Sequence, residues 1–269
     1  MMNKVFPESH NFQLKDNNGD IREIPVRFGG ENKGVIFIDY HGKSSFNNLV
    51  EFFGTHVQKK LRSQYKDNYC SNINMVTIYE FVRSLLKSKV YLYYPETFTS
   101  LIATLACIPT EIKEAQATRF DTILIDEVGC TNLIDKIESS YLKSRVKGNN
   151  STSAWYRAQN VLVETIKELM HNLGVNVVCT NTPMSVSRPS TTDHNESVVY
   201  NYGSYSYTIN GVDYLDHMIP MYRGFLDCTF IIEPGSHINP LSTAVGISMF
   251  MENTKRFIGH IDVLGDFIY

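Results

Sequence analysis

From residue 34 onward, short apolar runs alternate with longer stretches that have helical spacing. Continuous apolar runs of four or five residues are typical of strands buried on both faces. Apolar residues spaced three and four apart are typical of amphipathic helices. The predicted strands are 35–39, 90–94, 122–126 and 175–179, and the predicted helices are 46–61, 75–86, 101–107 and 153–173. This alternation predicts an α/β fold with a mostly parallel central sheet covered by helices on both faces.

The two ends of the chain have a different pattern. The turn signal Asn17-Asn18-Gly19-Asp20 separates two short apolar stretches and predicts an N-terminal β-hairpin. Residues 1–33 are therefore predicted to be a hairpin extension and 34–269 a single core domain. Three late strands, near 230–232, 245–251 and 257–263, are expected to complete the sheet, the last two as an antiparallel pair.

Two connections are too long to be simple links. Residues 127–152 and 181–226 both follow the carboxyl ends of predicted strands. Open α/β sheets bind their ligands at this edge, and long loops in a compact domain are often functional. The functional site is therefore expected there.

Composition and charge exclude several classes of protein. Lys and Arg number 25 against 28 Asp and Glu, so the net charge is −3 and nucleic-acid contact requires a local basic patch. No apolar run reaches the length of about 18 residues that a membrane helix needs. The five cysteines are scattered without a CxxC pair. We therefore expect an intracellular protein with no membrane contact, no metal and no resident cofactor.

One local patch is basic. The stretch from Tyr141 to Arg157 contains no acid. Lys and Arg neutralise phosphates, and nearby aromatic rings can stack on bases. The predicted DNA-binding residues are Lys143, Arg145, Lys147 and Arg157; the alternative is a solvated loop. The tyrosine-rich segment 198–214 has an acidic balance that suits contact with protein better.

Two segments have partial nucleotide-binding character. His41-Gly42-Lys43-Ser44 lies between a strand and a helix, but Phe37 stands where a phosphate loop has its first glycine. Ser44 or Ser45 is also suited to cap the helix. Asp126 and Glu127 end an apolar strand, as the acids that hold magnesium do in ATPases. Lys43, Ser44, Asp126 and Glu127 are thus either vestigial or part of an ATP and magnesium site.

The order of these segments resembles the RecA-type recombinases, in particular their eukaryotic paralogues of the X-ray-repair cross-complementing group. Residues 35–42 are similar to the family's "FID" strand, and 120–126 to its Walker B strand. The helix 153–173 and the segment 174–181 are similar to the family's helix, "FGV", strand and "TNQ" segment. The run 222–227 is similar to the approach to the family's next strand.

The resemblance implies a RecA-like fold and a role in DNA repair. The family's Walker A segment should precede residue 35, and its catalytic glutamate would fall at His41, so this chain would lack half of the ATPase site. It implies a nuclear, non-catalytic accessory subunit of homologous recombination that binds single-stranded DNA, other recombinase paralogues and the recombinase itself. The two DNA-facing loops of the family would correspond to 127–152 and 181–226.

Two other interpretations remain open. The first is a working ATPase with a degenerate phosphate loop at residues 42–44, in which Asn181 senses the γ-phosphate. The second is an interaction scaffold without a ligand, in which the tyrosine-rich segment forms the interface.

Overall fold

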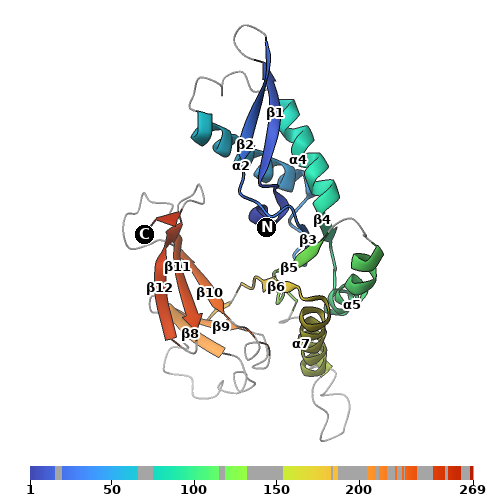
Figure 1. Ribbon diagram of the computed structural model, residues 1–269. Coiled ribbons are helices and arrows are strands. Elements are labelled where there is room, and N and C mark those ends of the chain that lie inside the picture. Colours follow the sequence, from blue (N-terminus) through green and yellow to red (C-terminus); the bar gives the residue numbers. More distant parts are fainter. Residues whose placement is uncertain are drawn as a thin grey trace, which may run out of the picture. The chain divides into compact units, whose positions relative to one another are not determined.

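The computed structural model describes residues 1–15, 20–65, 75–114, 119–131 and 154–182. Beyond residue 182 it describes the strands named below, with Tyr222, Leu226 and Cys228. The chain forms two compact units, Met1–Ile219 and Pro220–Tyr269 (Figure 1). The domain boundary predicted at residue 33 stays a prediction. Among the described residues, no helix is both long and apolar enough to cross a membrane.

The first unit contains the predicted parallel sheet. Its strands are β3 (Gly34–Asp39), β4 (Val90–Tyr93), β5 (Phe120–Asp126) and β6 (Asn176–Cys179), in the spatial order β4-β3-β5-β6. All three pairings are parallel. The α/β class, the parallel helix-covered sheet and the N-terminal hairpin are therefore confirmed.

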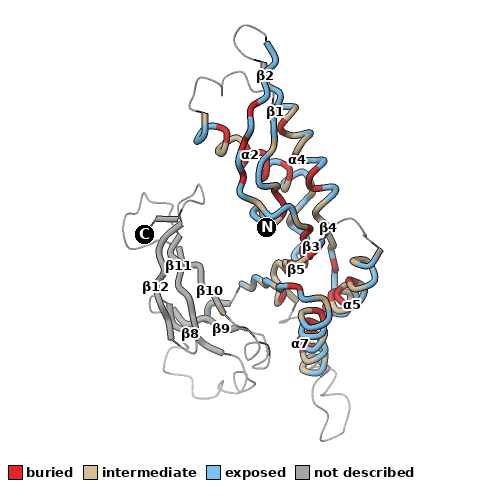
Figure 2. Tube along the Cα trace, viewed as in Figure 1, coloured by how far each residue is buried: buried red, intermediate tan, exposed pale blue. Residues whose placement is uncertain are grey.

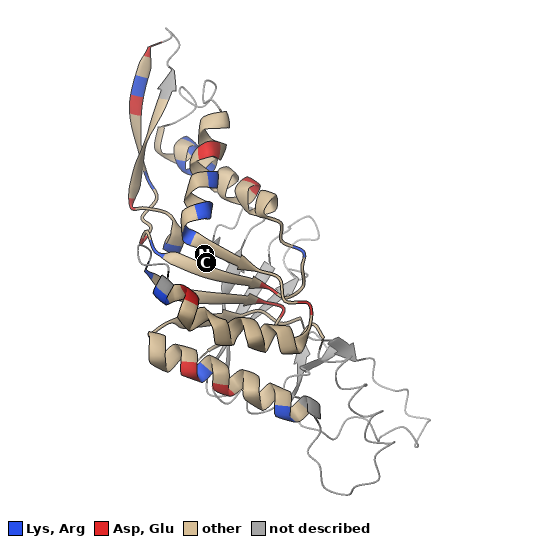
Figure 3. Ribbon diagram, turned by 90° about the vertical axis from the view of Figure 1, so that its right-hand side faces the viewer, with Lys and Arg blue, Asp and Glu red and all other residues tan. Residues whose placement is uncertain are grey.

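Four helices connect these strands. They are α2 (Phe46–Tyr65), α4 (Met75–Lys89), α5 (Phe98–Glu114) and α7 (Ala154–Leu173). α5 and α7 lie together on one side of the sheet, and α2 and α4 lie on the other (Figures 1 and 3). The helix predicted over 101–107 is too short, because α5 continues through Pro109 to Glu114. The buried side chains Leu101, Leu105 and Ile108 keep this face packed, which offsets the backbone hydrogen bond that proline removes.

The N-terminal segment packs against α2 and α4. It consists of α1 (Met2–Val5), β1 (Ser9–Lys15) and β2 (Ile21–Arg27), and the two strands pair antiparallel. The ring of Phe6 is 1% exposed and stacks on Phe28 at 4.5 Å and on Phe53 of α2 at 5.3 Å. These rings belong to one buried cluster that includes Val35 of β3. The hairpin thus shares a hydrophobic core with the sheet.

Polar contacts also hold the N-terminal segment in place, one at the end of β2 and one just before β3. The side-chain amide of Gln64 donates to the carbonyl of Arg27 at 2.7 Å and accepts from its N–H at 3.0 Å, which occupies the outer edge of β2. Lys33 Nζ lies 2.5 Å from Asp121 of β5 and 2.6 Å from Glu31. Burial by itself would raise the pKa of Asp121, but the hydrogen bonds from Lys33 and Thr122 and the charges of Lys4 and Lys33 hold it below its usual value.

The segment predicted as a long loop after β6 contains strands instead. β7 (Met184–Val186), β8 (Tyr205–Ile209) and β9 (Val212–Asp216) form an antiparallel sheet in the order β7-β9-β8. The sequence carried the signal: alternating polar and apolar residues flank Asn210-Gly211, a dipeptide favoured in two-residue hairpins. The prediction of a loop over 181–226 is therefore wrong.

The late strands do not complete the parallel sheet, as had been expected from their apolar runs. β10 (Thr229–Pro234), β11 (Val245–Met251), β12 (Thr254–Ile261) and β13 (Phe267–Ile268) form a separate antiparallel sheet. Parallel pairing needs a crossover of a dozen or more residues, and the connection between β11 and β12 is far too short for that. The predicted antiparallel pairing of the last two long strands is confirmed.

The aromatic core predicts the effect of removing Phe6. We expect Phe6→Ala to lower the free energy of unfolding by about 3–5 kcal/mol, because a fully buried phenylalanine leaves a cavity that its neighbours cannot fill. Phe52→Ala is the matched control: Phe52 is 60% exposed on α2, so its loss should cost less than about 1 kcal/mol. Urea denaturation measures both, and equal costs would contradict the assignment of the core.

Two histidines in this core predict a pH dependence of stability. Burial lowers the pKa of His10, and burial together with Lys60 and Lys59 lowers the pKa of His56. The unfolded chain therefore binds more protons than the folded chain just below about pH 6.5, so stability should fall as the pH decreases through that range. The melting temperature between about pH 7.5 and about pH 5.5 tests this. The slope should be smaller for His10→Leu, and a melting temperature that rises on acidification would contradict the account.

Candidate functional site

The turn between β3 and α2 lies at the carboxyl edge of the parallel sheet. α2 begins at Phe46, and the N–H of Asn48 donates to Ser45 Oγ at 3.1 Å. Ser45 is therefore the N-cap of α2, one of the two residues predicted for that role. The helix start needs no bound ligand to satisfy this amide.

A buried carboxylate organises the preceding turn. Asp39 is the last residue of β3 and is 0% exposed. Its two carboxylate oxygens accept from the N–H of Gly42 at 2.8 Å and from the N–H of Ser44 at 2.5 Å. Gly42 has a φ of 70°, a conformation that glycine adopts at little cost, and this folds the chain back over Asp39. Backbone amides that a phosphate loop would offer to a nucleotide are thus already bound to an anion of the protein itself.

The other groups of the turn are arranged around this carboxylate. Lys43 is exposed and makes no ion pair with the residues that the structure describes. The hydroxyl of Tyr94 donates to the carbonyl of Ser44 at 2.7 Å. Burial raises the pKa of Tyr94, and the negative charge of Asp39 raises it further.

The end of β5 brings Asp126 and Glu127 to the same edge. The N–H of Tyr40 donates to the carbonyl of Asp126 at 3.2 Å, so the two predicted segments are neighbours in space. Thr180 links them to the end of β6: its hydroxyl donates to Asp126 Oδ1 at 2.6 Å and accepts from the N–H of Glu127 at 2.8 Å. The two segments that the sequence groups as a vestigial or possible nucleotide site therefore lie next to each other at this edge.

Glu127 is held in an unusual conformation. Its φ of 57° is rare for a residue other than glycine and marks local backbone strain. Its carboxylate accepts from the N–H of Thr182 at 3.0 Å and from the Thr182 hydroxyl. Both acids are thus engaged by threonines. Within the described residues there is no group of three or more side chains that could hold a metal ion.

The predicted DNA-binding residues are only partly covered by the structure. Lys143, Arg145 and Lys147 lie outside the described residues. Arg157 is described, and it is exposed in the first turn of α7. Of the tyrosine-rich segment, Tyr205, Tyr207 and Tyr214 lie in β8 and β9. The basic patch stays a prediction.

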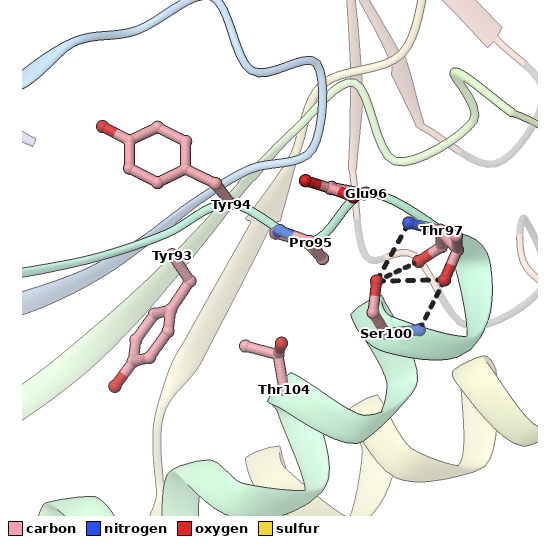
Figure 4. Close-up of a pocket in the computed structure, with 7 residues that line it drawn as sticks. All are labelled: Tyr93, Tyr94, Pro95, Glu96, Thr97, Ser100 and Thr104. Carbon is pink, nitrogen blue, oxygen red and sulfur yellow. Dashed lines mark hydrogen bonds between the residues drawn. The ribbon is translucent and has the colours of Figure 1, made fainter.

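An open cavity of about 470 Å³ lies at the end of β4 (Figure 4). Its lining comes from the end of β4 and the start of α5: Tyr93, Tyr94, Pro95, Glu96, Thr97, Ser100 and Thr104. Thr97 and Ser100 bond reciprocally through their amides and hydroxyls and cap α5. The dipole of α5 favours an anion here, whereas Glu96 disfavours one. The two effects oppose each other, so the lining does not indicate the charge of a ligand.

Comparison with known proteins gives matches among solved structures only. No family model and no curated protein matches the chain. An ATPase domain is similar with a TM-score of 0.44 and 9% identity, covering 87% of this chain and 74% of its own. A DnaB-like replicative helicase, solved to show its interactions with primase, has a TM-score of 0.45 and 9% identity, with 88% of this chain and 50% of its own covered. These similarities concern the fold alone.

Sequence reasoning missed the roles of three residues at this edge. For Asp39 the sequence suggests a strand end and a weak D-x-H metal pattern with His41, but the structure shows a carboxylate that binds the amides of its own turn. Thr180 and Thr182 lie more than fifty residues from the acids that they contact. No local pattern could have revealed those long-range hydrogen bonds.

The role of Asp39 predicts a loss of stability on neutralisation. We expect Asp39→Asn to lower the free energy of unfolding by about 1.5–3 kcal/mol, because a buried anion that accepts two amides becomes a neutral group with misplaced donors. Asp126→Asn should cost less, since Asp126 is partly exposed. Urea denaturation and the amide NMR shifts of Gly42 and Ser44 measure this. Unchanged shifts would contradict the assigned hydrogen bonds.

Proposed function

We propose that this chain is a non-catalytic, RecA-like recombinase paralogue that acts in the nucleus as an accessory subunit in homologous recombination. In this role it binds single-stranded DNA and partner paralogues and supports recombinase filaments. The resemblance of the sequence segments supports the family. The observation that carries the non-catalytic part is the buried carboxylate of Asp39, which occupies the amides of Gly42 and Ser44.

The turn is poorly suited to bind a nucleotide phosphate. A phosphate loop works because several free amides and a lysine converge on the anion. Here the two amides face Asp39, and an added phosphate would approach a buried negative charge. The acids Asp126 and Glu127 are bonded to threonines and lie beside this same turn. The edge therefore favours a subunit without ATPase activity.

The DNA-binding part rests on the basic run. Asp126 and Glu127 make the described edge acidic, as Figure 3 shows for the ends of the strands. A phosphate backbone is repelled by such an edge, so its attraction must come from Lys143, Arg145 and Lys147 in the segment after β5. Exposed Arg157 at the start of α7 adds a fourth cation.

The test of the proposal is single-stranded DNA binding at several salt concentrations. The Lys143→Ala, Arg145→Ala, Lys147→Ala triple variant should bind at least about tenfold more weakly at low salt. The magnitude of the slope of log affinity against log salt should also decrease by about 2. A variant with three fewer phosphate contacts releases fewer counterions from the DNA when it binds. Fluorescence anisotropy with a labelled oligonucleotide measures both quantities.

A matched variant controls for the loss of net charge. Lys59→Ala, Lys60→Ala, Arg62→Ala removes three cations from α2 instead and should leave the affinity and slope nearly unchanged. Equal losses in both triple variants would contradict a specific patch. Absence of any DNA binding by the unaltered chain would favour the scaffold interpretation instead.

A further inference from the structure

One row of apolar side chains crosses the parallel sheet on the side of α2 and α4. The register pairs Phe37 of β3 with Leu92 of β4 and with Leu124 of β5, and it pairs Leu124 with Val178 of β6. Paired residues of neighbouring strands point to the same face, so the four side chains form one row. We call Leu92, Phe37, Leu124 and Val178 the apolar row.

The apolar row is incompletely buried. Leu92, Phe37 and Leu124 are half-buried, and Val178 is 52% exposed. On the opposite face, Ile36, Ile38, Ile123 and Ile125 are at most 2% exposed, because α5 and α7 cover them (Figure 2). Parallel sheets are normally covered on both faces. Leu124 packs in part against the cluster of α2, α4 and the hairpin, but the described elements leave the apolar row incompletely covered.

The reason lies in the position of the N-terminal cluster. Phe6, Phe28 and Phe53 pack with α2 and α4 over the amino-terminal part of the strands, where Val35 is 0% exposed. Two residues further along the same strand, Phe37 is only half-buried. The cluster therefore stops short of the carboxyl half of this face.

Acidic side chains at the ends of β3 and β5 border the apolar row. Two residues beyond Phe37 and Leu124, on the same face, Asp39 ends β3 and Asp126 ends β5. Tyr94 and Thr180 directly follow the ends of β4 and β6. Asp39 is buried and bound by its turn, whereas Asp126 is partly exposed and is followed by Glu127. Lys43 in the adjacent turn is the exposed cation nearest in sequence to Asp39. Among the residues that the structure describes here, two accessible carboxylates stand against one lysine, so the described border has a negative charge.

We propose that the apolar row is the docking surface for an amphipathic, basic helix of a partner polypeptide. A helix is the element that covers a parallel sheet, and the row is about 14 Å wide at about 4.8 Å per strand, enough for two to three helical turns. Leucine-like side chains of the helix would cover the row, and its lysines or arginines would face Asp126 and Glu127.

The proposal deepens the partner-binding part of the proposed function and rests on it, but it does not depend on DNA binding. Variants of the apolar row should leave the salt-dependent affinity for single-stranded DNA unchanged. Failure of one proposal can thus be distinguished from failure of the other.

Model peptides test the occupant directly on the full chain. A fluorescent 14-residue helix with leucine on one face and lysine on the other should bind saturably. A version with glutamate in place of lysine should bind at least about tenfold more weakly because of the acidic border. A scrambled leucine and lysine peptide should not bind saturably. Equal binding of all three peptides, or no saturable binding, would overturn the proposal.

The chain offers a matched pair of variants. Val178 in the row and Val161 on α7 are 52% and 50% exposed. Val178→Asn should weaken the leucine and lysine helix about fivefold, since part of a valine is no longer buried on binding. Val161→Asn should have no effect, and equal effects would contradict docking at the row.

Hydroxyl-radical footprinting shows whether the apolar row is covered by the partner helix, by the chain itself or by a second copy of the chain. In the free chain, Phe37 and Leu92 should be oxidised more readily than Ile36 and Ile38, and the leucine and lysine helix should protect them. Protection of Phe37 and Leu92 in the free, monomeric chain would mean that the chain covers the row itself. Protection that disappears on dilution would mean that a second copy covers it. Either result would overturn the proposal.

Discussion

The need to bury both faces of a parallel sheet governs how this protein is built. Because every strand of the β4-β3-β5-β6 sheet is apolar on both sides, each face must pack against something. α5 and α7 cover one face with buried aliphatic side chains. The other face is covered by α2 and α4 only with the help of the N-terminal hairpin, whose aromatic rings complete that core. The hairpin is thus part of the architecture that supports the sheet, and on this face the described elements cover the carboxyl half of the sheet only in part.

The same geometry determines the chemistry of the carboxyl edge. Strands that end in Asp39 and Asp126 bring carboxylates together in one row, and the protein satisfies them with its own donors. Gly42 and Ser44 bind Asp39, while Thr180 and Thr182 bind the two acids that follow β5. An edge satisfied in this way is stable without a ligand. It has the position of a nucleotide site but offers a negative charge where a nucleotide site offers amides.

Much of this arrangement could be predicted from the sequence, for a physical reason. The four parallel strands and the four helices around them have clear periodicity, because burial on one or two faces leaves a regular pattern. The sequence grouped Lys43 and Ser44 with Asp126 and Glu127 as one vestigial or possible nucleotide site, and the structure places the two segments next to each other. Interactions between distant residues were not predictable: Thr180 with Asp126, Thr182 with Glu127, and Gln64 with the edge of β2. The helix over 101–107 is predicted too short because proline disrupts helices locally, whereas tertiary packing overrides that preference at Pro109 in α5. The late strands were assigned to the wrong sheet because apolar runs do not specify a pairing partner.

The proposal that the carboxyl edge lacks a working nucleotide site is tested most directly by equilibrium binding of ATP with magnesium. Calorimetric titration of the unaltered chain should show no saturable binding, and Lys43→Ala should behave in the same way, because the amides of the turn are held by Asp39. Saturable ATP binding that is lost in Lys43→Ala would contradict the account and identify the chain as an ATPase with a degenerate phosphate loop.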